Sequence, residues 1–242
     1  MTSMKTAERN AATVSRAEEI AAVLKHEILM GQYRAGERLP SERDLSKRFE
    51  TSRGTVREVL KKLEQLGIAS INQGGARVVP VEKATLDVLG VLLNLRHPPD
   101  SKLIDQVMEV FGVLMELAAQ SAVKCASDGQ LAEAIASAQN ILDADGDGAK
   151  QHTALRRMAF LFIEISEHLV LQLVFNGLQT QFINNPQHPE DQPVLEEKAL
   201  GRIIKKLQSG LKKRDEKIVS EAMMRMNKLI RESVRTAFNT KN

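Results

Sequence analysis

The sequence predicts a mainly α-helical protein: a small amino-terminal domain that ends in a β-hairpin, followed by an all-α helical bundle. Leu, Ala, Ile, Lys and Glu dominate the 242 residues, which favours helices over sheets. Apolar residues recur at helical spacing along most of the chain. Near residue 70 that pattern gives way to two short apolar stretches around a Gln-Gly-Gly turn, which is typical of a hairpin.

Composition limits the functions that are open to this chain. Its net charge is only +3, so any affinity for nucleic acid has to come from a local basic patch. Aromatic residues make up 3%, without Trp, which disfavours binding of single strands by stacking. Cys125 is the single cysteine and is expected to be a buried small hydrophobe, so neither a disulfide framework nor a cysteine zinc site is available.

The chain also lacks the features of a membrane or exported protein. No apolar stretch approaches ~20 residues, so no segment is expected to span a membrane. The first residues, MTSMKTAERNAATVSR, contain no apolar run and do not resemble a signal peptide. A soluble, cytoplasmic protein is expected.

The first domain is predicted at residues 16–80, after a flexible arm at 1–15. From Ala17 to Leu29 apolar residues follow a 3.6-residue period, and Gly31 ends that helix. Ser41 is a good N-cap for a short helix that runs to about residue 49.

A tight corner at residues 50–52 follows, with Thr51 or Ser52 as the next cap. A longer helix then runs from Arg53 to Leu66 and stops at Gly67, before the hairpin. A helix, a short helix, a corner, a third helix and a hairpin together make a winged helix-turn-helix.

Two arginines at the start of the third helix indicate what this domain binds. Arg53 and Arg57 are four residues apart and therefore share one face. The start of such a helix enters the major groove, where arginine can bind the O6 and N7 atoms of guanine. Ser52 and Thr55 can hold phosphates. An ordinary solvated helix face is the alternative, but the ordered cap, corner, apolar stripe and hairpin favour DNA binding.

The segment ILMGQYRAGERLPSERDLSKRFETSRGTVREVLKKLEQLGIASINQGGARVV resembles the amino-terminal domain of the GntR family of bacterial transcription regulators. The resemblance covers residues 17–80, including the PSER motif, the Ser-Arg-x-Thr-Val-Arg corner and the Gly-containing wing. It departs from the family at Gly54, where Thr or Ser is common, and at the wing tip, which lacks a basic residue. The resemblance implies that operator DNA is contacted by Arg43, Ser52, Arg53, Thr55, Arg57, Gln73 and Gly74.

The second domain, residues 81–242, is predicted to be all-helical. Such a bundle can enclose a ligand cavity between facing helices. Helices are expected at residues 86–95, 101–126, 129–142, 150–167, 168–184, 194–210 and 215–238, with a Pro-rich loop at 186–193.

Two stretches resemble the FCD-type effector domain of the GntR branch typified by the fatty-acid-metabolism regulator. They are ISEHLVLQLVFNGL at 165–178 and LIDQVMEV at 103–110. Many FCD domains bind a divalent metal through one Asp and three His. The matching positions are Leu155, Ala159, Ile204 and Met226, none of which can ligate a hard or borderline metal. No metal and no cofactor are therefore expected.

The resemblance implies instead a dry effector pocket around those four residues and His168. Long-chain acyl-CoA is one ligand consistent with it. Another apolar or carboxylate metabolite, or no ligand, remains open, because the chain has no Trp where that branch binds acyl-CoA. His168 could also be half of a surface pair with Glu164.

These observations predict a transcription regulator, not an enzyme, that binds a pseudo-palindromic DNA operator as a homodimer. A small-molecule effector would change its affinity for DNA, and the sequence leaves repression or activation open. The alternative is a metabolite-binding or enzymatic bundle that uses the helix-turn-helix-like domain for oligomerisation. No nucleophile and base stand together in the sequence to support that second hypothesis.

Overall fold

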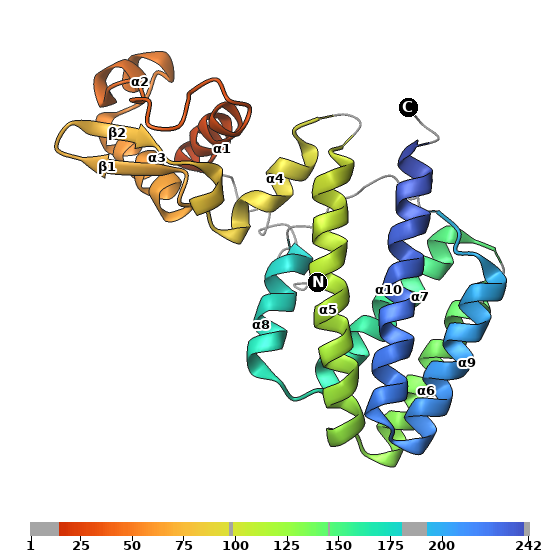
Figure 1. Ribbon diagram of the computed structural model, residues 1–242. Helices are drawn as coiled ribbons and strands as arrows, with labels where there is room; N and C mark the ends of the chain where they lie inside the picture. The colour runs from red at the N-terminus through yellow and green to blue at the C-terminus, as the bar shows by residue number, and fades with distance from the viewer. Residues whose placement is uncertain (1–14, 97–98, 145, 181–192, 240–242) are drawn as a thin grey trace, which may run out of the picture. The chain divides into compact units, whose positions relative to one another are not determined.

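The computed structural model describes residues 15–96, 99–144, 146–180 and 193–239, and it divides into two compact units between His97 and Pro98 (Figure 1). The expected arm lies outside the described residues except for Ser15, and the Pro-rich loop lies outside them except for Pro193. None of the described helices is long and apolar enough to cross a bilayer.

The first unit begins with helix α1, Arg16–Leu29, and continues with α2, Glu42–Arg48, and α3, Arg53–Gln65. The start of α1 is fixed by a capping box. The Ser15 hydroxyl accepts a hydrogen bond from the backbone N–H of Glu18, and the Glu18 carboxylate accepts one from the N–H of Ser15 at 2.9 Å. The three helices of the expected winged helix-turn-helix are present.

The hairpin consists of strands β1, Ala69–Asn72, and β2, Gly75–Val78, paired antiparallel. Gln73 and Gly74 form the two-residue turn between the paired residues Asn72 and Gly75. Gly75 has a φ of +101°, which residues with a side chain rarely adopt. The turn therefore falls within the Gln-Gly-Gly stretch, as the sequence predicts.

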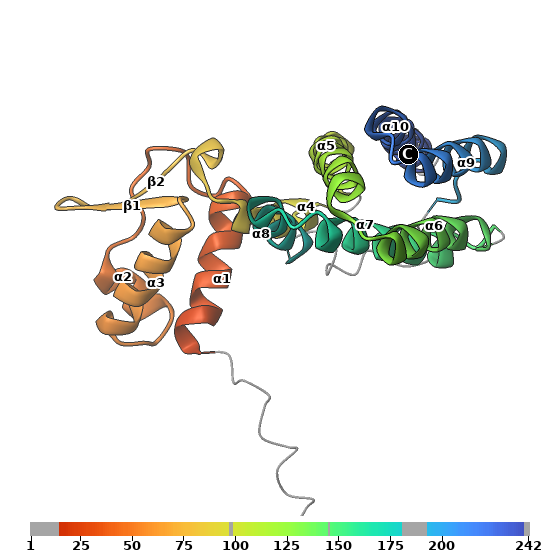
Figure 2. The ribbon, with the colours of Figure 1, turned by 90° about the horizontal axis from the view of Figure 1, so that it is seen from below.

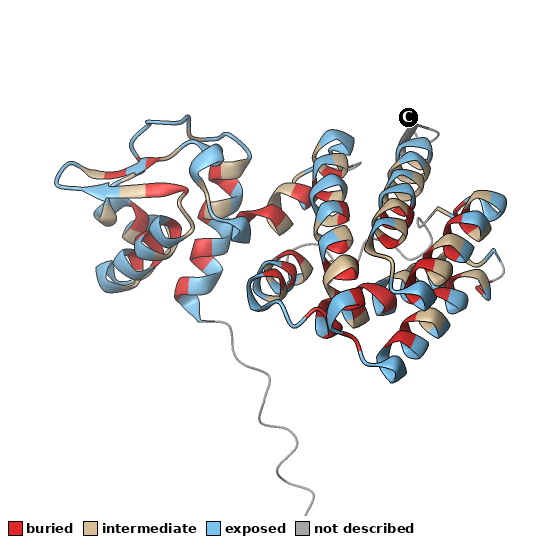
Figure 3. Cartoon of the chain, turned by 60° about the horizontal axis from the view of Figure 1, so that its bottom comes forward, coloured by how far each residue is buried: buried red, intermediate tan, exposed pale blue. Residues whose placement is uncertain are grey.

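One hydrophobic core holds the first unit together. Buried residues line the sides of the helices and of the hairpin that face each other (Figure 3). Burial of these side chains, rather than helix propensity alone, stabilises helices as short as α2. The most deeply buried residues of this core include Ile20, Leu24, Leu45, Val56, Val59, Leu63 and Ile68.

The segment after the hairpin belongs to the same unit. It forms two short turns of 3₁₀ helix, Val81–Lys83 and Leu86–Val88, and helix α4, Leu89–Asn94. Val88 is buried in the core of the first unit, and Leu92 packs against it. The compact unit therefore extends past residue 80, where the sequence places the end of the first domain, because this segment supplies part of its core.

The second unit is an all-helical bundle. Its core contains both small and large apolar residues, including Ala118, Ala119, Phe162, Ile204, Leu207 and Ala222. Its helices are α5 (Ser101–Cys125), α6 (Asp128–Leu142), α7 (Gly148–Ile165), α8 (Leu169–Leu178), α9 (Glu197–Lys213) and α10 (Glu216–Asn239).

Helix α9 begins later than residue 194, where the sequence predicts its start. The Glu196 carboxylate accepts hydrogen bonds from the backbone N–H groups of Lys198 and Ala199, at 3.0 and 2.6 Å, and so caps the helix there. Cys125 is exposed rather than buried, because it is the last residue of α5 and the next residue, Ala126, takes the buried position.

Helices α5 and α10 lie side by side and antiparallel (Figures 1 and 2). Where α5 begins, Asp105 accepts hydrogen bonds from the guanidinium groups of Arg231 and Arg235 at 2.7 to 3.1 Å. These bonds hold the pKa of the Asp105 carboxyl well below its usual range. Where α5 ends, Lys124 and Glu216 form an ion pair at 2.9 Å.

One side chain joins the α9–α10 corner to the α5–α6 corner. Arg214 ends α9 in the left-handed conformation, with a φ of 52°. Its guanidinium donates to the carbonyl oxygen of Ala126 and to the carboxylate of Asp128, both at 2.8 Å. The two corners are thereby fastened together at one end of the bundle.

Candidate nucleic-acid interface

The corner between α2 and α3 is closed by local hydrogen bonds. The Ser46 hydroxyl donates to the carbonyl oxygen of Thr51, and the N–H of Thr51 donates to the carbonyl oxygen of Ser46 at 3.0 Å. Glu50 adopts a left-handed φ of 49° within the corner. The chain therefore reverses within a few residues and presents the first turn of α3 beside α2.

Ser52 caps α3. Its hydroxyl accepts from the N–H of Thr55 at 3.1 Å and lies 3.0 Å from the Thr55 hydroxyl. The first turn of α3 contains no acidic residue to offset the partial positive charge at the helix start. Both hydroxyls thus lie where the backbone N–H groups and the helix dipole favour an anion such as phosphate.

Arg53 and Arg57 differ in what they contact. Arg53 is exposed, and no described carboxylate pairs with it. Arg57 is also exposed, but its Nε donates to both carboxylate oxygens of Glu42, at 3.0 and 2.9 Å. The end of the Arg57 guanidinium, with its two Nη groups, is left without a hydrogen-bond acceptor among the described residues. Both arginines can therefore offer a forked donor to a base edge.

Of the other predicted DNA contacts, Thr55 is half-buried, and Arg43, Ser52, Gln73 and Gly74 are exposed. Arg43 lies in the first turn of α2, and its nearest ion-pair contact is the Asp44 carboxylate at 3.9 Å. Gln73 and Gly74 form the turn of the hairpin. Figures 1 and 2 show this turn and α2 on the same side of the first unit. The predicted residues thus come from two places, the α2–α3 corner and the hairpin turn.

A further arginine of this stretch has a structural task instead. The Arg48 guanidinium donates to both carboxylate oxygens of the buried Glu27, lies 3.4 Å from the Tyr33 hydroxyl and stacks 4.7 Å from the Phe49 ring. These contacts fix α2 against α1. Arg48 is therefore a scaffold residue rather than a free cation for DNA.

The sequence did not predict the carboxylate that holds Arg57. Glu42 and Arg57 are 15 residues apart and come together only when the corner folds. An acidic residue in the first turn of α2 is expected from the helix dipole alone. The presence of Glu42 in the sequence therefore does not indicate that it also pairs with Arg57. Two arginines beside the hairpin, Arg38 and Arg77, were not predicted either.

In the second unit, most of the residues predicted for an effector pocket lie in the hydrophobic core. Ala159, Ile204 and Met226 are buried in it, and Leu155 packs against it. His168 lies elsewhere: it is exposed and caps α8, accepting from the N–H of Leu171 at 3.2 Å. The pocket stays a prediction, and an apolar ligand there would have to displace packed side chains.

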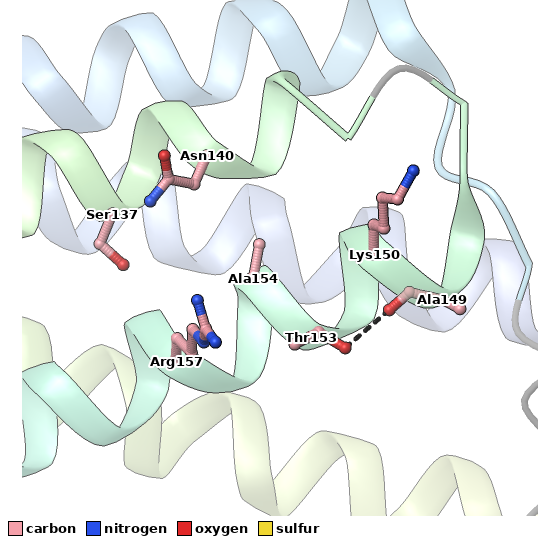
Figure 4. Close-up of a pocket in the computed structure, with 7 residues that line it drawn as sticks. All are labelled: Ser137, Asn140, Ala149, Lys150, Thr153, Ala154 and Arg157. Carbon is pink, nitrogen blue, oxygen red and sulfur yellow. Dashed lines mark hydrogen bonds between the residues drawn. The ribbon is translucent and has the colours of Figure 1, made fainter.

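An open depression lies between α6 and α7 (Figure 4). Its volume is about 490 Å³, and it shares no residue with the predicted pocket. The Thr153 hydroxyl there donates to the carbonyl oxygen of Ala149 at 2.8 Å, within α7. The residues that line the depression are Ser137, Asn140, Ala149, Lys150, Thr153, Ala154 and Arg157.

The donor groups of a metal site do not come together in the part of the chain that the structure describes: no three His, Cys, Asp or Glu side chains are grouped there. His152 is half-buried and lies 3.3 Å from the carbonyl oxygen of Pro193. Burial lowers the pKa of the His152 imidazole and favours its neutral form.

Residues 16–79 match the family model described as "Bacterial regulatory proteins, gntR family". Two kinds of named regulator are similar to the chain in sequence. The HTH-type transcriptional regulator Mce2R of Mycobacterium tuberculosis is 32% identical over 136 residues, which cover 54% of this chain and 55% of that protein. The chain thus matches only about half the length of that relative.

The fatty acid metabolism regulator protein of Klebsiella pneumoniae is 29% identical over 182 residues, which cover 73% of this chain and 74% of that protein. Both of these relatives are named as regulators, and neither is named as an enzyme.

A similar fold is found in a solved structure described as "Lar controls the expression of the Listeria monocytogenes agr system and mediates virulence." That chain has a TM-score of 0.54 and 16% identity, and the match covers 92% of this chain and 97% of that one. At such low identity the match shows the fold alone. Residues 16–79 are therefore similar to the gntR family of bacterial regulatory proteins.

Proposed function

We propose that the chain is a transcription regulator that binds a pseudo-palindromic operator as a homodimer and changes its affinity for DNA when a small molecule binds the second unit. One observation carries the proposal. The α2–α3 corner presents the Arg53 guanidinium, and the free end of the Arg57 guanidinium, at the start of a capped helix without acidic residues in its first turn. This is the arrangement with which a recognition helix reads guanine in the major groove.

A homodimer matches the twofold symmetry proposed for the operator. A single α3 reads one half-site, whereas a pseudo-palindrome has two related by twofold symmetry. Arg43, Ser52, Thr55, Gln73 and Gly74 are assigned to the same operator, chiefly as contacts to its backbone. The match of residues 16–79 to a family of regulatory proteins supports this assignment.

The decisive experiment is selection of the preferred duplex from a random pool, followed by binding measurements with purified variants. Replacing Arg53 and Arg57 with Ala should abolish specific binding and leave the circular dichroism spectrum unchanged. The matched control removes two exposed or half-exposed cations of the same unit outside α2, α3 and the hairpin, Lys25→Ala with Lys83→Ala. Specific binding that survives the Arg53 and Arg57 double substitution would refute the proposal.

The effector is proposed to be apolar or a carboxylate, with long-chain acyl-CoA as the first compound to test. The similarity to a protein named fatty acid metabolism regulator, over 73% of this chain, supports this choice. The compound should release the operator at concentrations where free CoA does not, because differential affinity for two states is what shifts an equilibrium. Equal effects of acyl-CoA and free CoA would refute acyl-chain recognition.

A further inference from the structure

The loop before α2 lengthens the sheet of the hairpin. The N–H of Gly36 donates to the carbonyl oxygen of Val78, and the N–H of Leu39 donates to that of Ala76, both at 2.9 Å. Between them, Arg38 and Arg77 face each other as an antiparallel pair. The loop therefore runs along the free edge of β2 and places one arginine directly opposite another.

These two arginines lie on the outer face of the sheet. Ala76 and Val78 are buried beneath it, so Arg77, which alternates with them, points outward, and its partner Arg38 shares that face. The Arg38 guanidinium extends over Gly75: a Cβ atom at that glycine would lie 3.0 Å from its Nε and 3.1 Å from its Nη2. Arg38 thus reaches the residue that directly follows the hairpin turn.

Both charges lack a counterion within the described part of the chain. The Arg77 guanidinium donates to the carbonyl oxygen of Gly36 at 3.0 Å, and neither Arg38 nor Arg77 pairs with a carboxylate among the described residues. The nearby Glu37 carboxylate instead accepts from the backbone N–H of Arg34 at 2.8 Å. Like charges directly opposite each other destabilise a sheet. Stability of the fold therefore does not account for this pair, whereas an external anion would.

We infer that Arg38 and Arg77 bind the phosphate backbone of the operator, and that Arg38 supplies the cation that the uncharged turn of the hairpin lacks. The inference rests on the proposed function. A guanidinium fork matches the geometry of phosphate oxygens. Since the hairpin turn and α2 lie on the same side of the first unit (Figures 1 and 2), one duplex can engage both. Phosphate contacts carry no sequence information, so these arginines contribute affinity and orientation rather than specificity.

Salt dependence distinguishes this inference from a structural role. Affinity for the selected operator and for an unrelated duplex is measured by fluorescence anisotropy across a salt series, for the full chain and for Arg38→Gln and Arg77→Gln. Each substitution should lower both affinities by about threefold to tenfold and reduce the slope of log affinity against log salt by about 1. The ratio between the two duplexes should stay unchanged, while Lys25→Gln should leave the slope as it is.

Stability and rescue complete the test. Because Arg38→Gln removes a like-charge contact, its melting temperature should stay the same or rise, and Arg38→Lys should restore the salt slope. Arg77→Gln also removes the hydrogen bond to the carbonyl oxygen of Gly36, which offsets part of that gain. Unchanged slopes in both Gln variants would overturn the inference, as would a loss of affinity that follows a loss of stability and is not restored by Lys. Failure of the unmodified protein to bind any duplex would instead refute the proposed function.

Discussion

Arg57 is held by a carboxylate before any DNA is present. An exposed ion pair such as Arg57–Glu42 contributes only about 0.2–1 kcal/mol, so DNA can compete for the arginine. While the pair persists, the contact through Nε orients the guanidinium and leaves its two Nη groups to face a base. Glu42 also places a negative charge near the expected path of the duplex, which opposes binding to DNA of any sequence.

Glu42→Gln should therefore make DNA binding less specific for sequence. We expect affinity for unrelated DNA to rise about twofold to fivefold, because a repulsive charge is removed. Discrimination against a base change at the guanine read by Arg57 should fall by about fivefold to tenfold, since the fork is less well oriented. Anisotropy titrations at one salt concentration measure both. Glu58→Gln is the control, since that exposed glutamate pairs with Lys62 on the same helix; wild-type discrimination in Glu42→Gln would contradict the prediction.

Ser52 caps α3 and is proposed to contact a phosphate, and two substitutions separate these roles. Ser52→Ala removes the cap and should lower the free energy of unfolding by about 1 kcal/mol. Ser52→Asp keeps a capping acceptor but adds a negative charge where a phosphate is expected. It should preserve stability in urea unfolding and lose DNA affinity at least tenfold. Equal DNA affinity of Ser52→Asp and the unmodified chain would show that Ser52 only caps the helix.

For single residues, the sequence best predicts those roles that depend on the spacing of neighbours along one helix. The cap at Ser52 and the shared face of Arg53 and Arg57 follow from positions within one turn of helix. The partners of Arg57 and of Arg38 do not, because each pairing joins residues that are distant in the chain. Contacts of that kind require the folded corner and the extended sheet.

At the scale of the elements, α5 and α10 pack closely against each other at Gly112. A Cβ atom there would overlap the side-chain amide of Asn227. Gly112→Ala should therefore destabilise the protein by about 1–3 kcal/mol, because a short amide cannot move away freely. Gly201→Ala, in α9, meets nothing within 4 Å and should instead stabilise by up to about 1 kcal/mol. Urea unfolding compares the two, and equal effects would contradict the close approach.

The Asp105 carboxylate links the same two helices and makes their stability depend on pH. Its pKa is lowered in the folded state, so its stabilising effect is complete above the unfolded pKa of about 3.9 and is lost as the pH falls below it. Asp105→Asn should cost about 1–3 kcal/mol at pH 7, and the difference from the unmodified chain should shrink towards pH 2. Glu109→Gln, whose carboxylate meets Arg231 only at 3.4 Å, should cost less. A pH-independent difference would contradict this account.

Most helices could be predicted because their caps and apolar periods are local. Ser41 and Ser52 cap the helices at the expected positions, and Gly67 follows α3 with a φ of +72°. The extent of the first unit could not be predicted, since Val88 joins its core only through tertiary packing. The predicted effector pocket could not be checked from sequence either, because a cavity depends on how the side chains pack.

At the scale of the whole molecule, the net charge of +3 hides a local concentration of cations around the α2–α3 corner and the hairpin. Two copies on a pseudo-palindrome would bring two such surfaces to one duplex. Inserting about 5 base pairs between the half-sites should then weaken binding more than tenfold, because the half-sites turn to opposite faces of the duplex. Base changes at the centre that keep the length serve as the control. Unchanged affinity after the insertion would show that copies bind independently.

Arg214 belongs to one of two sets of contacts that hold the ends of the bundle together. Its guanidinium fastens the α9–α10 corner to the α5–α6 corner, and the Asp105 carboxylate ties α5 to α10 near the other end of the two helices. A molecule wedged into the core would therefore have to spread α5 and α10 between these two ties, or break one of them.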